Sequence, residues 1–222
     1  MSGDFSDLPG TSTEAERVAS AFSKRHRREE VTLLAGFEAG EAAVAAAMAG
    51  SGLVHLATHG FFATGRCHSV LASSEALGFN PMLLSGIVLS GANDPPDDGE
   101  DGMLTAEEVV GLDLRGVDLV VLSACDTGLG EVQSGEGVMG LRRAFAAAGA
   151  QSMVMSLWGV PDVPTVDLMA ALYRDYGHKK RHLPAADALR RAQLEMLENN
   201  RRVHGEGRPG EWAAFIAVGQ LE

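Results

Sequence analysis

Two short apolar runs, residues 53–60 (LVHLATHG) and 119–128 (LVVLSACDTG), constrain the fold of this chain more than any other feature. Each run is too short for a helix of ordinary length, and each stops at a reactive side chain, His59 or Cys125, with a glycine close behind. Continuous apolar runs of this length are typical of buried parallel strands. Because ligands and catalytic groups gather at the carboxyl edge of such sheets, the pattern predicts that His59 and Cys125 share one edge.

Further strand and helix signals alternate along the chain, which indicates an α/β fold with a largely parallel sheet. Thr105 precedes Glu108 by three residues, a spacing that predicts a capping box on a short helix. A polar segment at residues 1–12 is predicted to be flexible and to precede one domain at residues 13–222. Strands are expected at residues 31–35, 87–90 and 151–157 and near 211–219, and helices at 14–22 (capped by Ser12 or Thr13), 38–48, 137–148, 163–176 and 184–197, with Leu168, Leu172, Leu189 and Leu194 facing inward.

Composition limits the classes of function that fit this chain. Its 222 residues, 45% of them hydrophobic, are enough for one domain with a substantial core. The net charge of -12 disfavours nucleic acid as a direct partner, because phosphate binding needs a basic surface. The chain has two cysteines, Cys67 and Cys125, and lacks both a signal-peptide pattern and a long apolar stretch. We therefore expect a cytoplasmic protein that does not bind membranes.

A thiol and an imidazole at one sheet edge predict nucleophilic catalysis. The thiol of Cys125 would attack a carbonyl carbon, while His59 would help maintain the thiolate and protonate the departing amine. Backbone N–H groups of Gly60 and Cys125 are candidates to hold the oxyanion. His55 and His59 lack the glutamate of a zinc-protease motif, and Cys67-His68 lacks further ligands, so we expect neither a metal nor an organic cofactor. His55 is expected to be a hydrogen-bonded core histidine.

Several blocks around these residues, in the same order along the chain, resemble the CHAT domain family. These are caspase-like domains that are often joined to tetratricopeptide repeats, in the clan that includes caspases, separases and gingipains. The resemblance covers about residues 50–220, and more loosely the chain from residue 9. Its blocks are residues 55–60, 102–109, 119–128, 135–140, 148–152, 156–162 and 212–216.

This resemblance implies a three-layer caspase–haemoglobinase-like sandwich, with a mostly parallel central sheet, and a His59–Cys125 dyad. It implies a cysteine endopeptidase that acts on a protein substrate and is controlled by a partner such as a tetratricopeptide-repeat protein or domain. The alternative is a non-catalytic interaction module with the same fold. Residues 61–85 and the acidic segment 93–102, which we expect to be an exposed, mobile loop, are candidates for a gate or for processing.

Two carboxylates are candidates for a specificity pocket. Asp126 adjoins Cys125, and Asp162 follows the next expected strand. A carboxylate at the base of a pocket would favour Arg or Lys before the scissile bond, through charge-assisted hydrogen bonds. Asp162 has an equally good alternative role as a helix cap. Trp158 is expected to pack beside the site, with a secondary role in the pocket wall.

Overall fold

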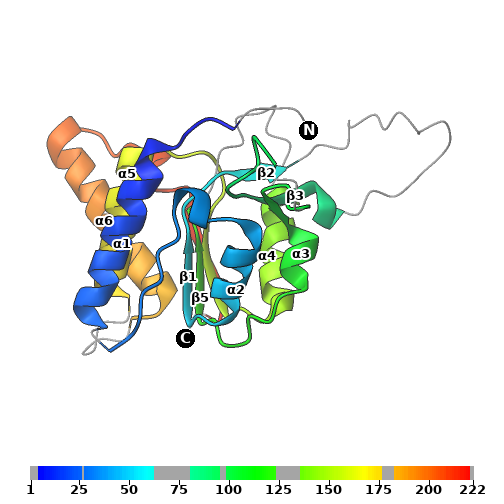
Figure 1. Cartoon of the computed structure of the whole chain (residues 1–222). Helices are drawn as coiled ribbons and strands as arrows, with labels where there is room; N and C mark the ends of the chain where they lie inside the picture. The colour runs from blue at the N-terminus through cyan, green and yellow to red at the C-terminus, as the bar shows by residue number, and fades with distance from the viewer. Residues whose placement is uncertain are drawn as a thin grey trace.

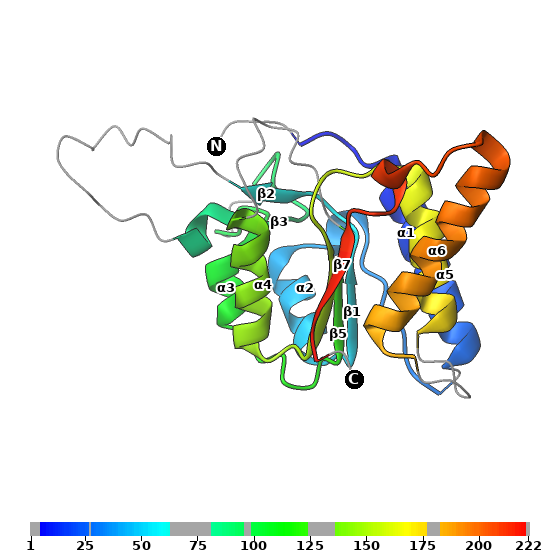
Figure 2. The same cartoon turned by 180° about the vertical axis from the view of Figure 1, so that it is seen from behind.

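The computed structural model describes residues 5–26, 28–62, 81–95, 99–123, 136–176 and 183–220. Its centre is a four-stranded sheet in the order β1-β5-β6-β7. β1, β5 and β6 run parallel, and β7 is antiparallel to β6, so the predicted mostly parallel sheet is confirmed. Figure 2 shows β7, in red, along the edge of this sheet. The strands are β1 (Leu53–Leu56), β5 (Leu119–Leu122), β6 (Ser152–Ser156) and β7 (Phe215–Gly219).

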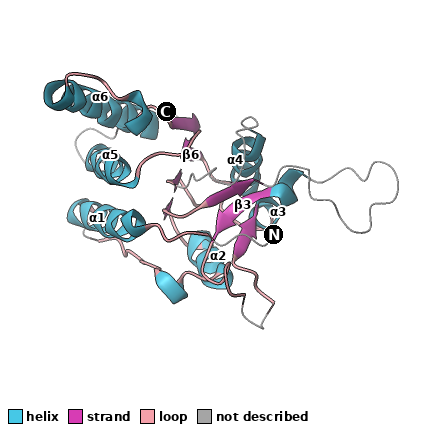
Figure 3. Cartoon of the chain, turned by 90° about the horizontal axis from the view of Figure 1, so that it is seen from above, coloured by secondary structure: helices cyan, strands magenta, loops and turns pink. Residues whose placement is uncertain are grey.

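Helices cover both faces of the sheet and make three layers (Figures 1 and 3). Side chains alternate across β5: Val120 and Leu122 belong to one apolar core, and Leu119 and Val121 to the other. Every residue of β5 is therefore buried, which explains its unbroken apolar run. The first core lies under α2 (Glu41–Ala49), α3 (Ala106–Val110) and α4 (Glu136–Ala148), and the second under α1 (Pro9–Arg25), α5 (Asp162–Asp175) and α6 (Ala185–His204).

A second, antiparallel sheet continues from the end of β1. It has the order β2-β3-β4, with strands β2 (Gly60–Phe62), β3 (Ser85–Val88) and β4 (Met103–Thr105). The strand expected at residues 87–90 is thus β3, two residues earlier and outside the main sheet. Thr105 caps α3 through the predicted capping box with Glu108. Three short 3-10 turns complete the described elements: η1 (Gly36–Glu38), η2 (Pro81–Leu84) and η3 (Pro209–Glu211).

The strand predicted at residues 31–35 is wrong. These residues form no strand, and Val31 and Leu33 are 36% and 45% exposed. Among the described residues β1 is an edge strand that pairs with β5 alone. Without a neighbouring strand, the β-branched and apolar side chains at 31–35 cannot by themselves form a sheet.

Several helix boundaries also differ from the prediction. α1 begins at Pro9, so residues 9–12 are helical and neither Ser12 nor Thr13 is its cap. Proline suits this first position, where its missing N–H would have no helical partner. α2 begins at Glu41 rather than at residue 38, because η1 occupies residues 36–38. α6 continues to His204, beyond the expected end at residue 197.

One of the leucines predicted to face inward does not. Leu194 is 46% exposed, whereas Leu168, Leu172 and Leu189 are buried. Leu194 therefore lies on the outer side of α6.

The acidic segment 93–102 is partly anchored. Glu100 accepts a hydrogen bond from Ala42 N at 3.2 Å, and Gly102 N donates to the Glu41 carboxylate at 2.6 Å. Residues 96–98, and residues 63–80 of the other gate candidate, lie outside the described residues. In the part of the chain that the structure describes, no helix combines the length and apolar character needed to cross a membrane.

Candidate active site at the carboxyl edge of the sheet

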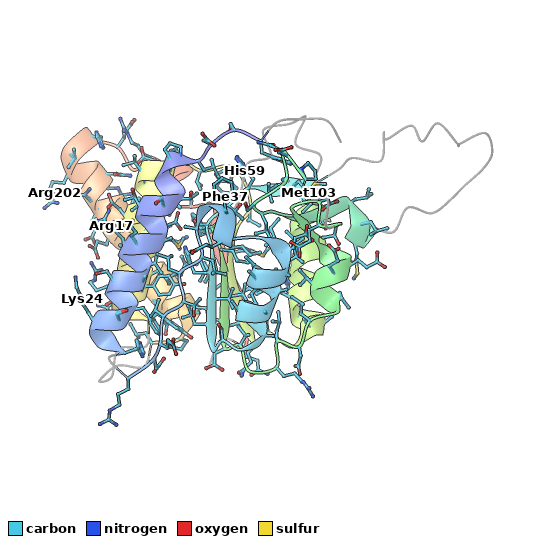
Figure 4. The ribbon with its side chains drawn as sticks, in the orientation of Figure 1. Arg17, Lys24, Phe37, His59, Met103 and Arg202 are labelled. Carbon is cyan, nitrogen blue, oxygen red and sulfur yellow. The ribbon has the colours of Figure 1, made fainter. Side chains whose placement is uncertain are left out.

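His59 lies where the two sheets meet, just after β1 and immediately before β2. Figure 4 shows it near the top of the sheet, at the same end of the molecule as the start of α1. Its backbone is anchored to the second sheet, since Val88 N donates to His59 O at 2.8 Å. The residue is only 7% exposed. The sequence prediction that His59 lies at the carboxyl edge is confirmed.

The imidazole of His59 is oriented by the segment that precedes α1. Its Nε2 lies 2.7 Å from the carbonyl oxygen of Ser6, and the ring of Phe5 lies 5.9 Å from it, centroid to centroid. A carbonyl only accepts, so Nε2 carries the hydrogen and the basic lone pair of neutral His59 is on Nδ1. Asn93 holds this segment in place, because its side chain accepts from Phe5 N at 2.8 Å and donates to Phe5 O at 2.9 Å. Sequence reasoning missed Ser6, because a backbone carbonyl has no sequence signal.

The end of β5 lies beside the end of β1. Leu56 is in register with Leu122, and Ser123 N donates to Leu56 O at 2.9 Å. Ser123 is 9% exposed and is the last described residue before a gap. Cys125 and Asp126, predicted as nucleophile and pocket residue, lie outside the described residues.

Gly60, the predicted oxyanion donor, begins β2 opposite Ile87. Hydrogen-bonded and non-hydrogen-bonded pairs alternate along an antiparallel ladder. Because Val88 N donates to His59 O, the Gly60–Ile87 pair falls on the non-hydrogen-bonded position. The N–H of Gly60 is therefore directed away from β3.

A cavity of about 250 Å³ lies at this edge, between the start of α1, the start of α5 and the ends of β1, β5 and β6. Thr58, Ser123 and Asp162 line it, together with Glu14, which the sequence analysis did not single out. Trp158 is 40% exposed and is not part of the described lining. The structure thus brings Asp162, but not Trp158, to the cavity beside Ser123.

Asp162 is the first residue of α5, yet among the described residues it makes no cap hydrogen bond to that helix. Its Oδ2 instead accepts from Gly10 N in α1 at 3.3 Å. A Cβ at position 10 would lie 2.5 Å from the Asp162 Cβ, so only glycine permits this approach. The hydrogen bond of Asp162 therefore goes to the first turn of α1 rather than to the first turn of its own helix, α5.

A buried polar network lies behind the cavity. His55 Nε2 is 2.9 Å from Glu14 Oε1, and His55 Nδ1 is 3.1 Å from the hydroxyl of Tyr173. Burial, and then the charge of Glu14, raise the pKa of Tyr173 well above its usual value, so the phenol stays protonated and can donate to Nδ1. His55 is thus a hydrogen-bonded core histidine, as predicted. Among the described residues no group of three or more His, Cys, Asp or Glu side chains could hold a metal ion.

The fold and the position of His59 define a three-layer α/β protein of the caspase-like kind. Comparison with known families agrees: the model of the CHAT domain matches residues 1–220, and the chain belongs to that family. Two curated relatives are similar to part of it. The human and mouse proteins named tetratricopeptide repeat protein 28 are each 35% identical, over 117 and 118 residues. Each match spans 53% of this chain and only 4% of the length of the relative.

Proposed function

We propose that this CHAT domain is a cysteine endopeptidase that cleaves a protein substrate through a His59–Cys125 dyad. The observation that carries the proposal is the geometry of His59. It is nearly buried at the carboxyl edge, and its Nε2 is committed to Ser6 O, which leaves Nδ1 as the basic nitrogen. Cys125 follows Ser123 by two residues in the sequence, and Ser123 lies at that same edge.

The proposed reaction balances without a cofactor. Nδ1 of His59 takes the thiol proton, and the thiolate of Cys125 attacks the scissile carbonyl carbon. Backbone N–H groups of Gly60 and Cys125 hold the oxyanion. The C–N bond then breaks as His59 gives its proton to the departing amine, which leaves a thioester. Water, deprotonated by His59, attacks that thioester, and the C–S bond breaks to release the carboxylate product and the thiol.

The Ser6 carbonyl has a defined part in this scheme. When Nδ1 takes a proton, the ring becomes a cation, and the carbonyl dipole at Nε2 stabilises that charge while it keeps the ring in place. Residues 5–8 are thus part of the catalytic machinery.

Cleavage after a basic residue is the proposed specificity, with Asp162 and Asp126 as carboxylates of the pocket. The support is the position of Asp162 on the cavity beside Ser123. Trp158 is proposed only as an outer contact for the substrate, since it is half exposed on the loop after β6.

A non-catalytic interaction module is the second candidate. It is favoured by the two relatives, whose names refer to repeats rather than to an activity. The same names support a tetratricopeptide-repeat partner or domain as regulator, with residues 61–85 or 93–102 as the gate.

Alkylation and cleavage distinguish the two candidates. Iodoacetamide should label Cys125 faster than Cys67 near neutral pH, because a paired imidazole raises the thiolate fraction. A proteome-derived peptide library should show new amino termini with the wild-type protein and with Cys67→Ala, and none with Cys125→Ala. Equal labelling of the two thiols, or undiminished cleavage by Cys125→Ala, would remove the peptidase proposal in favour of the interaction module.

A further inference from the structure

The cavity at the carboxyl edge is walled by carboxylates from two helices that are distant in sequence. Glu14 comes from α1 and Asp162 from α5. We propose that Glu14 is a specificity-determining residue, which acts with Asp162 to select a cationic side chain immediately before the scissile bond. This inference rests on the proposed peptidase function, and it assigns to Glu14 a role that neither the motifs nor the family match supplies.

Glu14 is held so that one of its oxygens remains for a ligand. The residue is 3% exposed, and its Oε1 accepts from Nε2–H of His55. The Tyr173 hydroxyl, which stays protonated, can donate to the other nitrogen of the same ring 3.1 Å away. Among the described residues, Oε2 of Glu14 has no hydrogen-bond donor. Burying a carboxylate this deeply with only one oxygen hydrogen-bonded lowers the stability of the protein, unless a cation binds the other oxygen.

Asp162 presents a similar arrangement. Gly10 N binds its Oδ2, and within the described part of the chain no hydrogen bond engages Oδ1. The two carboxylates therefore offer two acceptor oxygens from different walls of one cavity. A guanidinium, with five N–H donors in a planar fork, can bridge such a pair better than an ammonium group can.

Ser123 gives an independent sign that the cavity takes a polar ligand. Its hydroxyl lines the cavity, is buried, and has no hydrogen-bond partner among the described residues. A buried hydroxyl without a partner costs stability, and a polar group of a ligand that enters the cavity would give it one. No Lys or Arg occurs in the described lining to neutralise the two carboxylates from within the protein.

The volume argues for one side chain rather than for a whole small molecule. About 250 Å³ lies below the roughly 300–1,000 Å³ of typical small-molecule sites. The cavity also adjoins Ser123, two residues before Cys125 in the sequence, which is where the side chain of the cleaved residue would enter.

Covalent peptide probes test this assignment. Peptidyl chloromethyl ketones that end in arginine, norleucine or aspartate alkylate a thiolate by displacing chloride, and mass spectrometry of the labelled peptides gives the rate at Cys125. We expect the arginine probe to label wild-type Cys125 fastest. Glu14→Gln should slow the arginine probe by about tenfold or more and leave the norleucine probe within about twofold. Gln keeps the size of the side chain and an oxygen that can accept from His55.

Glu16→Gln is the matched control. It makes the same change of charge on the exposed side of the same helix, and it should behave like the wild type. An unchanged arginine rate in folded Glu14→Gln would overturn the role of Glu14 and leave the peptidase standing. Labelling of Cys125 no faster than that of Cys67 by every probe would instead remove the peptidase itself.

A second measurement covers the case in which Glu14→Gln does not fold. Benzamidine, a small cation, should occupy the cavity and slow labelling by the norleucine probe, whereas neutral benzamide should not. In Asp162→Asn this protection should weaken but persist, because Glu14 remains. Complete loss of protection in a folded Asp162→Asn protein would overturn the assignment.

Discussion

The two faces of the central sheet are built on different principles. On the face covered by α2, α3 and α4, the core centres on fully buried apolar side chains such as Phe145 and Ile87. On the face covered by α1, α5 and α6, Glu14, His55 and Tyr173 form a hydrogen-bonded polar network inside an otherwise apolar core. The first face is packed with apolar side chains, whereas the second also brings a carboxylate, that of Glu14, to the candidate site. Under the proposed function, stability and recognition are assigned to opposite sides of one sheet.

The largest expected effect on stability lies on the apolar face. Phe145 is completely buried in α4, so Phe145→Ala should lower the free energy of unfolding by about 3–5 kcal/mol. Denaturant unfolding measures this loss. The relative rates of the arginine and norleucine probes at Cys125 should not change in the protein that remains folded. A changed probe preference would show that the two faces are not separable.

Tyr173→Phe should cost less stability but affect the site. It removes the donor to His55 Nδ1 and leaves a buried acceptor unsatisfied, at a cost of about 1–3 kcal/mol. Because His55 then orients the Glu14 carboxylate less firmly, the arginine-to-norleucine ratio should also fall. Tyr173→Phe should therefore lose less stability than Phe145→Ala but change the arginine-to-norleucine ratio more. An unchanged arginine-to-norleucine ratio would show that the network of Glu14, His55 and Tyr173 has only a structural role.

The smallest expected effect on the free energy of unfolding occurs at alkaline pH. The chain has two tyrosines, and burial raises the pKa of both Tyr173 and Tyr176 above the usual value of 10.0. The unfolded chain therefore loses its phenol protons first, so this contribution to stability is complete below pH 10 and declines as pH rises further. Ultraviolet titration of the phenolate should show both groups ionising above pH 10 in the folded protein and near 10 after unfolding. Titration of Tyr173 at its ordinary pKa in the folded protein would contradict its burial in the network.

Local patterns in the sequence predicted much of the fold. The capping box at Thr105 and the buried strand β5 were predicted, and β6 and α4 match their expected ranges, residues 151–157 and 137–148, to within one residue at each end. The strand expected at residues 31–35 failed for a different reason. Its residues suit a strand, but pairing depends on a neighbour that no local signal specifies.

The candidate site was predictable only in part. His59, Gly60 and Asp162 carry signals in their own segments, since each follows an apolar run or begins a helix. Glu14 reads as an ordinary residue of an amphipathic helix, and Ser6 contributes a carbonyl that any residue could supply.

The sequence by itself determined most of the segments that form strands and helices, and which reactive side chains stand at their ends, because these signals extend over a single turn or strand. Only the tertiary structure decided which charges meet there. The hydrogen bonds that join Glu14 to His55 and Gly10 to Asp162 connect positions 41 and 152 residues apart. Such pairings arise when α1 packs beside α5 on one face of the sheet, and no periodicity within one element encodes them.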